Sequence, residues 1–476
     1  MMQLHLEENK LSGNRGSVSA TTSTLLNYQV QDSEAHSEFP QWWNDGAAKA
    51  WELFESMPMP SRRDEDWRFA SIRTMDLEPY SVPGTDEVVD SDLPTPDLEF
   101  EGHACFVNEQ EVRFEALPQS LTDQGVIWTT LADAVKNHPE LIQKYFMQNE
   151  AELGSQKFAH LHRALVRSGT VLYVPKGVEI EKPLLVEYWI DGENVSVFPH
   201  TLIIAEENSS VTLMDLFRSK TELPAFACAV SDLHTGNGAK VSYLCSQQWS
   251  EQTLSIQLGA TETGKDAHSK AFYFNTGGNF ARLETVARCS GQGARSEVLG
   301  LSLVHGRQEF DQRTLQLHDV PNTWSDLLFK NSLNHRGKSI FSGLIRVAPG
   351  AKQTDAYQTN RNLLLDSNAE ADSMPGLEIF NDDVKCSHGA TTSQIDEEPL
   401  FYMAARGIPE YEAKHLIALG FCEELLERFD HNEFNEFLRE QIEEKYARSS
   451  KLMLRGISKT SQEEDYTNVR QLQGTV

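Results

Sequence analysis

The sequence predicts a mainly β protein whose β-solenoid core lies between helical regions at both ends. Apolar residues recur at helical spacing before residue 168 and after residue 395, but not between these positions. Within the interval, a small or polar turn followed by an apolar strand returns at residues 208, 238, 266, 293, 337 and 369. One strand signal per loose period is typical of stacked coils, because each coil can bury its inner face only against its neighbours.

A β-sandwich is the alternative that this stretch leaves open. A sandwich would show hairpin signals roughly every 8 to 12 residues. The steps between the units here are 30, 28, 27, 44 and 32 residues, and two-residue turns such as Asn237-Gly238 are scarce. We therefore favour a solenoid core over residues 168–395.

Two segments precede the predicted core. Residues 1–38 are rich in Ser, Thr, Asn and Gln and have few large apolar side chains, so we expect a disordered leader. Residues 39–167 should form a mainly helical, loop-rich domain. Its first helix carries Trp43, Ala47, Ala50 and Phe54 at helical spacing, and a second helical stretch runs from 131 to 167.

Residues 396–450 should form a C-terminal helical domain, and 451–476 a loose polar tail. Pro409 stands where a first helical position is expected, and Ile417, Phe421, Leu425 and Phe429 follow at four-residue steps. This apolar stripe must pack either on the core of the chain or on a partner.

The composition excludes several classes of function. The chain of 476 residues has 42 Lys and Arg against 71 Asp and Glu, a net charge of -29, which repels nucleic acids and anionic membranes. No window approaches the roughly 18 apolar residues of a membrane span, and the first residues lack the apolar segment of a signal peptide. We expect a cytosolic protein whose six cysteines, which include no CxxC pair, are free thiols.

Cys386 and His388 are the candidate metal or cluster ligands. In a strand, residues two apart lie on one face, about 6.6 Å apart along the chain, and thiolate and imidazole suit iron, iron-sulfur clusters and zinc. Two ligands do not fill a coordination sphere, so the others must come from elsewhere in the chain or from a second subunit. The alternative is a buried cysteine beside a hydrogen-bonded histidine.

Two other motifs do not support catalysis. The stretch "GATETGKD" at 259–266 has Asp266 where a phosphate-binding loop needs Ser or Thr, and a strand pattern follows, so it should be a turn. Asp382 and Asp383 would point to opposite faces if they lie in a strand, which argues against paired acid-base carboxylates and a polysaccharide-acting solenoid enzyme.

The stretch "FNDDVKCSHGATTSQIDEEPLFYMAARGI" at 380–408 closely resembles the C-terminal signature of the SUF-system iron-sulfur cluster assembly scaffolds, the SufB/SufD family. "MPMPSRRDEDWRFASI" at 57–72 resembles the N-terminal motif of that family, and "VLYVPKGVEIEKPLLVEYW" the entry to its core. Gly389 stands where B-type members tend to carry Glu, so the resemblance favours the D type.

The resemblance implies a right-handed parallel β-helix, a B-type partner subunit and an ATPase that docks on the C-terminal helices. The candidate docking residues are Pro409, Tyr411, Ile417, Phe421, Leu425 and Phe429. It also implies that His388, with Cys386 close by, contributes to a transient cluster or iron site shared with the B-type subunit. We therefore expect a non-catalytic scaffold; a B-type or homodimeric scaffold and, less favoured, a polysaccharide-acting enzyme are the alternatives.

Overall fold

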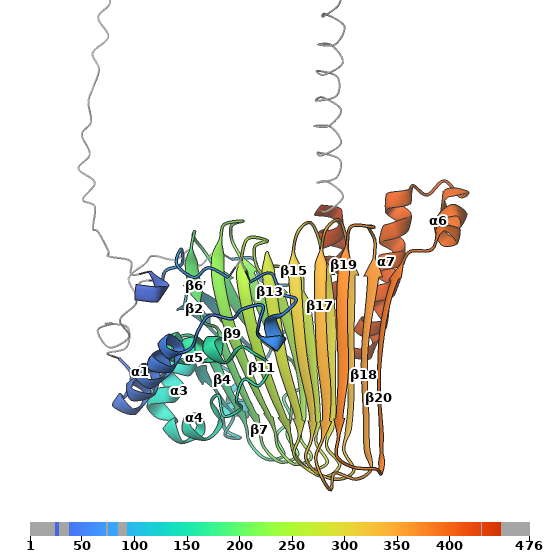
Figure 1. Cartoon of the computed structure of the whole chain (residues 1–476). Helices are drawn as coiled ribbons and strands as arrows, with labels where there is room; N and C mark the ends of the chain where they lie inside the picture. The colour runs from blue at the N-terminus through green and yellow to red at the C-terminus, as the bar shows by residue number, and fades with distance from the viewer. Residues whose placement is uncertain (1–23, 28–37, 73–74, 84–92, 430, 449–476) are drawn as a thin grey trace, which may run out of the picture.

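The chain folds around a solenoid of about eight turns, formed by two sheets of ten strands among the described residues (Figure 1). The structure is a computed structural model, and it describes residues 24–27, 38–72, 75–83, 93–429 and 431–448. The solenoid predicted between 168 and 395 is confirmed, and the β-sandwich alternative is wrong. Every strand pair in the core is parallel.

From β7 onward, the strands alternate between the two sheets along the chain. The first sheet has the spatial order β2 (Gln110–Phe114), β1 (Gly102–Val107), β5 (Leu184–Ile190), β8 (Ser210–Ser219), β10 (Lys240–Gln248), β12 (His268–Asn275), β14 (Arg295–Val304), β16 (Trp324–Leu333), β18 (Thr354–Leu364), β20 (Val384–Gln394). The second sheet has the order β3 (Ile127–Thr130), β4 (Thr170–Val174), β7 (His200–Ala205), β9 (Ala225–Thr235), β11 (Leu254–Thr263), β13 (Phe280–Cys289), β15 (Glu309–His318), β17 (Lys338–Val347), β19 (Glu370–Ile379), and β6 (Val195–Val197) pairs with β9.

A left-handed backbone position recurs shortly before the strands of the first sheet and explains the repeating turn signal. Asn208, Gly238, Asp266, Gly293 and Asn322 all have φ between 52° and 78°, a region that Gly, Asn and Asp tolerate best. The amide of each corner donates to a carbonyl in the corner of the next coil, as Asn208 does to Asn237 at 2.8 Å. The corners therefore stack from coil to coil.

The irregular step of 44 residues arises because the two predicted units on either side of it begin strands of different sheets. The unit predicted at 293 begins β14 of the first sheet, whereas the unit predicted at 337 begins β17 of the second sheet. The coil between them contains β16, whose corner at Asn322 was not recognised from the sequence. Trp324 pairs with Arg295, which is an ordinary spacing of one coil.

The interior of the solenoid contains an apolar cluster and, at other positions along the strands, a row of polar side chains. One cluster of buried apolar residues extends from Ala104 to Phe341 and includes Tyr243, Tyr273 and Phe329. Beside it, residues paired in register across six coils form a polar ladder: Gln247, Asn275, Ser302, Asn331, Asn362 and Thr392. The amide of Asn331 donates to Asn362 at 2.8 Å, and that of Asn362 donates to Thr392 at 3.2 Å. These bonds satisfy side chains that would otherwise be buried without partners.

The N-terminal region combines helices with strands of the core sheets. The helices and short 3-10 turns are η1 (Leu25–Asn27), α1 (Gln41–Ser56), η4 (Glu65–Trp67), α2 (Gln119–Thr122), α3 (Leu131–Asn137), α4 (Pro139–Tyr145) and α5 (Gln156–Leu165). Helix α1 buries the four residues predicted for its inner face. The stretch from 131 to 167, expected as one helical stretch, is divided into three helices by breaks at His138 and after Tyr145.

Three strands within residues 39–167 were not expected. All six residues of β1 are buried, so the strand lacks the alternation that marks a half-exposed strand. β1 pairs in parallel with β5 of the core, and β2 and β3 pair antiparallel with β1 and β4. The N-terminal end of each sheet is thus closed by an antiparallel strand.

The predicted leader and tail lie largely outside the described residues. Of residues 1–38, the structure describes 24–27 and Glu38, and Leu25 is buried with its amide donating to the Tyr80 carbonyl at 2.6 Å. Residues 451–476 are not described.

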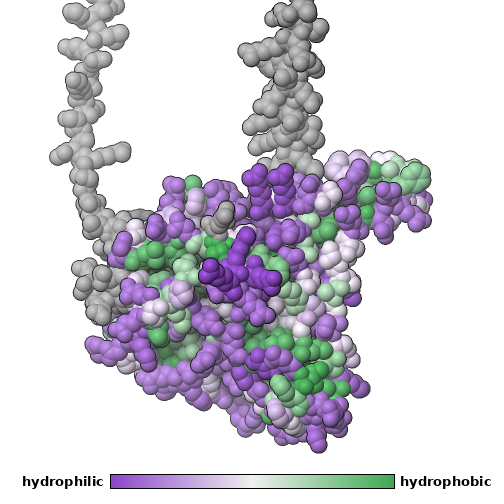
Figure 2. All heavy atoms as spheres, in the orientation of Figure 1, coloured by the Kyte–Doolittle hydropathy of each residue, from purple (hydrophilic) through white to green (hydrophobic). Residues whose placement is uncertain are grey.

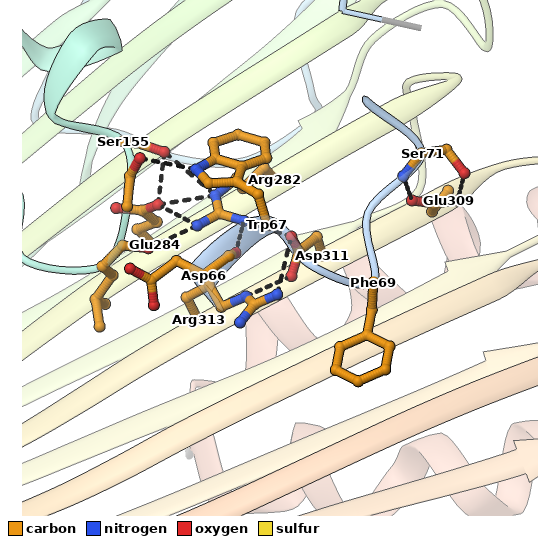
Figure 3. A network of polar contacts seen from close by, with 12 residues as sticks. Asp66, Trp67, Phe69, Ser71, Ser155, Arg282, Glu284, Glu309, Asp311 and Arg313 are labelled. Carbon is orange, nitrogen blue, oxygen red and sulfur yellow. Dashed lines mark hydrogen bonds and ion pairs between the residues drawn. The ribbon is translucent and has the colours of Figure 1, made fainter. Parts of the chain in front are cut away.

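The N-terminal motif at 57–72 is held on the outer face of the second sheet by a buried arginine (Figure 3). The Arg282 guanidinium is fully buried between Glu284 at 2.7 Å and Asp311. It also donates to the Asp66 carbonyl at 3.0 Å and lies 3.7 Å from the centre of the Trp67 ring. Because a buried charge needs partners on all sides, this cluster fixes the motif to the core.

The C-terminal helices pack against the outer face of the first sheet. Helix α7 (Glu410–Phe429) and the helical residues 432–448 bury an apolar cluster with residues of the sheet that include Leu244, Phe272 and Leu328. Helix α6 (Glu397–Ala404) has no buried residue and projects beyond the last coil (Figure 1). Over the described residues, no helix is both long and apolar enough to cross a membrane.

Candidate functional site at the open end of the solenoid

The two sheets end differently at the two ends of the solenoid. Antiparallel strands β2 and β3 close the N-terminal end, whereas β20 and β19 are the last strands at the other end. Most residues of β20 are exposed, and those of β19 are exposed or half-buried. Within the described residues no further strand covers this end, so the inner side chains of the last coil are left uncovered.

Cys386 and His388 lie on the same face of β20, which is the face that points into the solenoid. They pair in register with Ala356 and Gln358 of β18, both of which are buried. The thiol and imidazole therefore belong to the interior column of the last coil. They are accessible because no next coil covers them.

The two side chains have different surroundings. Cys386 is half-buried against the apolar cluster of Ile345, Val347, Ala351 and Ala356. Burial, and secondarily the charge of Asp355, raises the pKa of its thiol, so at neutral pH the group is protonated. His388 is exposed. The histidine side chain is thus open to a ligand from outside the chain, and the cysteine must lose a proton before it can bind a metal.

The chain offers two donors at this end, which is fewer than a complete site needs. Among the residues that the structure describes, no group of three or more His, Cys, Asp and Glu side chains could hold a metal ion. A tetrahedral iron or zinc site has four ligands. The arrangement can therefore contribute to a site but cannot enclose one alone.

The other five cysteines are buried free thiols, as the sequence predicts. Burial raises the pKa of Cys105, Cys289 and Cys422 to about 12, and it raises the pKa of Cys228 and Cys245 further. Since the thiolate is the reactive form, these residues are inert as sulfur acceptors in this conformation.

The predicted docking stripe on the C-terminal helices is largely intramolecular. Leu425 and Phe429 are 0% and 4% exposed and pack in the cluster shared with the first sheet, and Ile417 and Phe421 are half-buried against it. This burial corrects the expectation that Leu425 and Phe429 are available to a partner. Pro409 is exposed, and Tyr411 is 63% exposed.

Sequence reasoning missed three other exposed apolar side chains of this region, one of which, Phe401, is more exposed than Tyr411. Phe401 is 77% exposed and Tyr402 57%, both on α6, and Leu416 on α7 is 46% exposed. Figure 2 shows apolar surface on the projecting helix. The signal was present in "PLFYMAARGI", where two adjacent aromatic residues lie in a helix that is too short to bury both faces.

The structure supports no catalytic role for the other motifs in the sequence. In "GATETGKD", residues 259–263 are the end of β11, and only 264–266 form the predicted turn before β12. Asp382 and Asp383 lie in a bend before β20, so the premise that they are strand neighbours is wrong. His162 is buried on α5 and bonds to the Cys228 carbonyl at 2.7 Å and to His200 at 3.1 Å, which is a structural role.

Comparison with known proteins agrees with this architecture. Residues 188–421 match the family described as "SUF system FeS cluster assembly, SufBD core domain", and residues 20–186 match "SufBD protein N-terminal region". The chain is 30% identical over 404 residues to "Iron-sulfur cluster assembly protein SufD" of Bacillus subtilis. The aligned residues cover 83% of this chain and 91% of that protein. SufBD family proteins of Staphylococcus epidermidis and Synechocystis are 27% and 28% identical, covering 83% and 79% of this chain and 87% and 85% of their own lengths.

The fold defines a β-solenoid protein that presents the half-buried thiol of Cys386 and the exposed imidazole of His388 at one end. The chain belongs to the SufBD family and takes part in iron-sulfur cluster assembly by the SUF system. Members of this family generally serve as non-catalytic scaffold components.

Proposed function

We propose that this chain is the D-type scaffold subunit of a SUF assembly complex, and that it supplies His388, assisted by Cys386, to iron or a nascent cluster at the interface with a B-type paralogue. The observation that carries the proposal is the position of both side chains on the uncovered inner face of the last coil. A site with two donors exposed at a solenoid end is suited to sharing with a second subunit. The cluster is cargo that is assembled and passed on.

The D-type assignment is supported by Gly389 and by the relative named SufD. A glutamate at position 389 would add a carboxylate one residue from His388, on the opposite face of β20. The glycine adds no carboxylate to that face. The expected cytosolic location stays a prediction.

We propose that the ATPase docks on the α6–α7 corner. Phe401, Tyr402 and Tyr411 provide an exposed aromatic surface there, and residues 396–448 contain fourteen acidic residues against six Lys and Arg. Buried aromatic anchors with a charged rim are typical of interface hot spots. The partner surface should therefore offer an apolar pocket with a basic rim.

A homodimeric or B-type scaffold is the nearest alternative. The same open end would then pair with a copy of itself, and the chain alone would take up iron and sulfide. Cluster uptake by the purified chain without its paralogue would favour this alternative. Glycan cleavage by the purified chain would instead revive the less favoured enzyme hypothesis.

The proposal is tested by replacing His388 with Ala in the reconstituted complex with the paralogue and the ATPase. Cluster yield, followed by visible absorbance, should fall about tenfold or more, because loss of one ligand typically lowers metal affinity by at least this factor. His138→Ala, at a partly exposed histidine between α3 and α4, is the control and should leave the yield unchanged. Normal yield from an intact His388→Ala complex would remove this residue from the site.

A further inference from the structure

We propose that the packing of the helical residues 432–448 on the corners of the first sheet is a pH-sensitive contact, which is closed while His305 is neutral and opens when His305 binds a proton. His305 lies in the corner between β14 and β15. The inference goes beyond the proposed function and does not rest on it, because it concerns how the chain holds its own C-terminal helix.

The end of this helix is anchored to three corners of the solenoid. The Lys445 amine donates three hydrogen bonds, to Glu251 at 2.5 Å, to the Thr276 carbonyl at 2.9 Å and to Gln308 at 3.2 Å. These partners lie in the corners after β10, β12 and β14. In the next position, the Tyr446 hydroxyl lies 2.5 Å from that of Ser332. Lys445 and Tyr446 are 9% and 4% exposed, so the anchor is enclosed by the chain.

His305 packs against this anchor without a hydrogen bond from its ring. The ring centre lies 5.2 Å from that of Tyr446, and the ring of His415 on α7 lies 4.9 Å from Tyr446. His305 is 4% exposed, and within the described part of the chain neither of its ring nitrogens has a hydrogen-bond partner. A protonated imidazole has two N–H donors. Both would be buried without an acceptor, which is costly for a charged group.

The titratable groups around His305 also oppose a proton on its ring. They are Lys445 of the helix, His335 in the corner before β17 and His415 of α7, and among the described residues the groups that act on the ring include no carboxylate. Tyr446 stays neutral, because burial raises the pKa of its hydroxyl well above the ordinary value. Burial is the main cause, and the three neighbours add to it, so the pKa of His305 lies well below its ordinary value.

His415 differs from His305 because acidic side chains accompany it. Burial lowers the pKa of His415, but the charges of Glu443 and Glu412 raise it. A proton on His415 is therefore partly compensated, whereas a proton on His305 is not. We assign the pH sensitivity of the contact to His305 for this reason.

The sign of the pH dependence follows from the lowered pKa of His305. Opening of the helix returns the ring to water, where its pKa is about 6.5. At higher pH the ring is neutral in both states, and the contact keeps its full stability. At lower pH the open state binds a proton that the closed state excludes. The ratio of open to closed molecules should therefore rise about tenfold for each pH unit below about 6.5.

Opening would uncover apolar side chains on both sides of the contact. Phe434, Leu438 and Ile442 of the helix are 0%, 0% and 1% exposed. They share one cluster with α7 and with residues of the first sheet, including Leu244 and Phe272. Protonation of one buried ring would thus release a large apolar face.

Hydrogen exchange of peptides within 434–446 of the purified chain measures the opening. His305→Phe keeps an aromatic ring against Tyr446 and removes both proton-binding nitrogens. Comparison of wild type with this variant at the same pH cancels the effect of pH on the chemical exchange rate. Between pH 7.5 and pH 5.0, the exchange rate of wild type relative to His305→Phe should rise about thirtyfold.

Two further variants make the test independent of any one substitution. His305→Gln also cannot bind a proton, and the same rise of about thirtyfold is expected relative to it. His138→Phe, at a partly exposed histidine between α3 and α4, is the matched control and should keep the pH dependence of wild type. A relative rate that changes less than about twofold against both His305 variants would overturn the inference. Loss of the pH dependence in His138→Phe would also overturn it, because the effect would then not belong to His305.

Discussion

Cys386 and His388, two positions apart on one strand, show how local surroundings separate two candidate ligands. The cysteine packs among aliphatic side chains that favour its neutral thiol, whereas the histidine is exposed. A nearby metal ion or partner cation would be needed to lower the pKa of the thiol. We therefore assign the primary role to His388.

Asp215 allows the protonation of a buried carboxyl in the solenoid to be tested by a single substitution. It is 1% exposed on β8 and accepts a hydrogen bond from the Tyr243 hydroxyl at 2.6 Å. Burial raises the pKa of this carboxyl to about 7. The pKa in the unfolded chain is about 3.9, so the favourable contribution of the bound proton is complete below about pH 4 and is lost as the pH rises through 7.

Asp215→Asn should therefore be more stable than wild type at high pH. Between pH 5 and pH 8 the difference in the free energy of unfolding should grow by about 3 kcal/mol. Thermal and denaturant unfolding at both pH values would measure it, with Asp382→Asn at an exposed position as the control. A difference that does not depend on pH would show that Asp215 is ionised in the folded protein.

At the scale of elements, the sequence predicted the repeating strands because each coil carries a visible corner. Asn208, Gly238, Asp266 and Gly293 are residues that tolerate a left-handed backbone, and they mark four strands of the first sheet. β16 was missed although its corner at Asn322 has the same left-handed backbone. The strand β1 was missed because full burial removes alternation.

The candidate pair could be predicted from the sequence, but its accessibility could not. Spacing alone places Cys386 and His388 on one face of a strand. Whether that face is covered depends on β20 being the last strand of its sheet, which is a property of the whole coil order. The prediction that Leu425 and Phe429 are available to a partner failed for a similar reason. A helical period shows which residues share a face but not what lies against that face.

Leu425 and Tyr411 test the division of α7 into buried and exposed parts. Leu425→Ala should lower the free energy of unfolding by about 2–5 kcal/mol, because it leaves a cavity in the cluster shared with the first sheet. Tyr411→Ala should change it by less than about 0.5 kcal/mol and should weaken ATPase binding about tenfold. Denaturant unfolding and titration calorimetry separate the two effects.

Ser367→Ala, on an exposed turn beside the same helices, is the control for both measurements. Unchanged ATPase binding by the folded Tyr411→Ala variant would contradict docking at the α6–α7 corner. Unchanged stability of Leu425→Ala would contradict the intramolecular packing of α7.

At the scale of the molecule, the solenoid has one closed and one open end. The antiparallel strands β2 and β3 close the first end, and Arg282 fixes the N-terminal motif to the outer face of the second sheet. The other end presents inner side chains and a free strand edge next to the C-terminal helices. Under the proposed function the remaining ligands belong to a partner surface that covers this end, so a single sequence could not specify the completed site.

The most direct test of the account is equilibrium iron binding in the presence of sulfide by this chain alone, by the B-type paralogue alone and by the mixed pair. Because this chain supplies two donors, we predict that the mixed pair binds iron at least about tenfold more tightly than either subunit, and that His388→Ala abolishes the gain while the pair still forms. Equally tight binding by the isolated chain, or a gain that persists in the His388→Ala pair, would contradict a shared site at the open end.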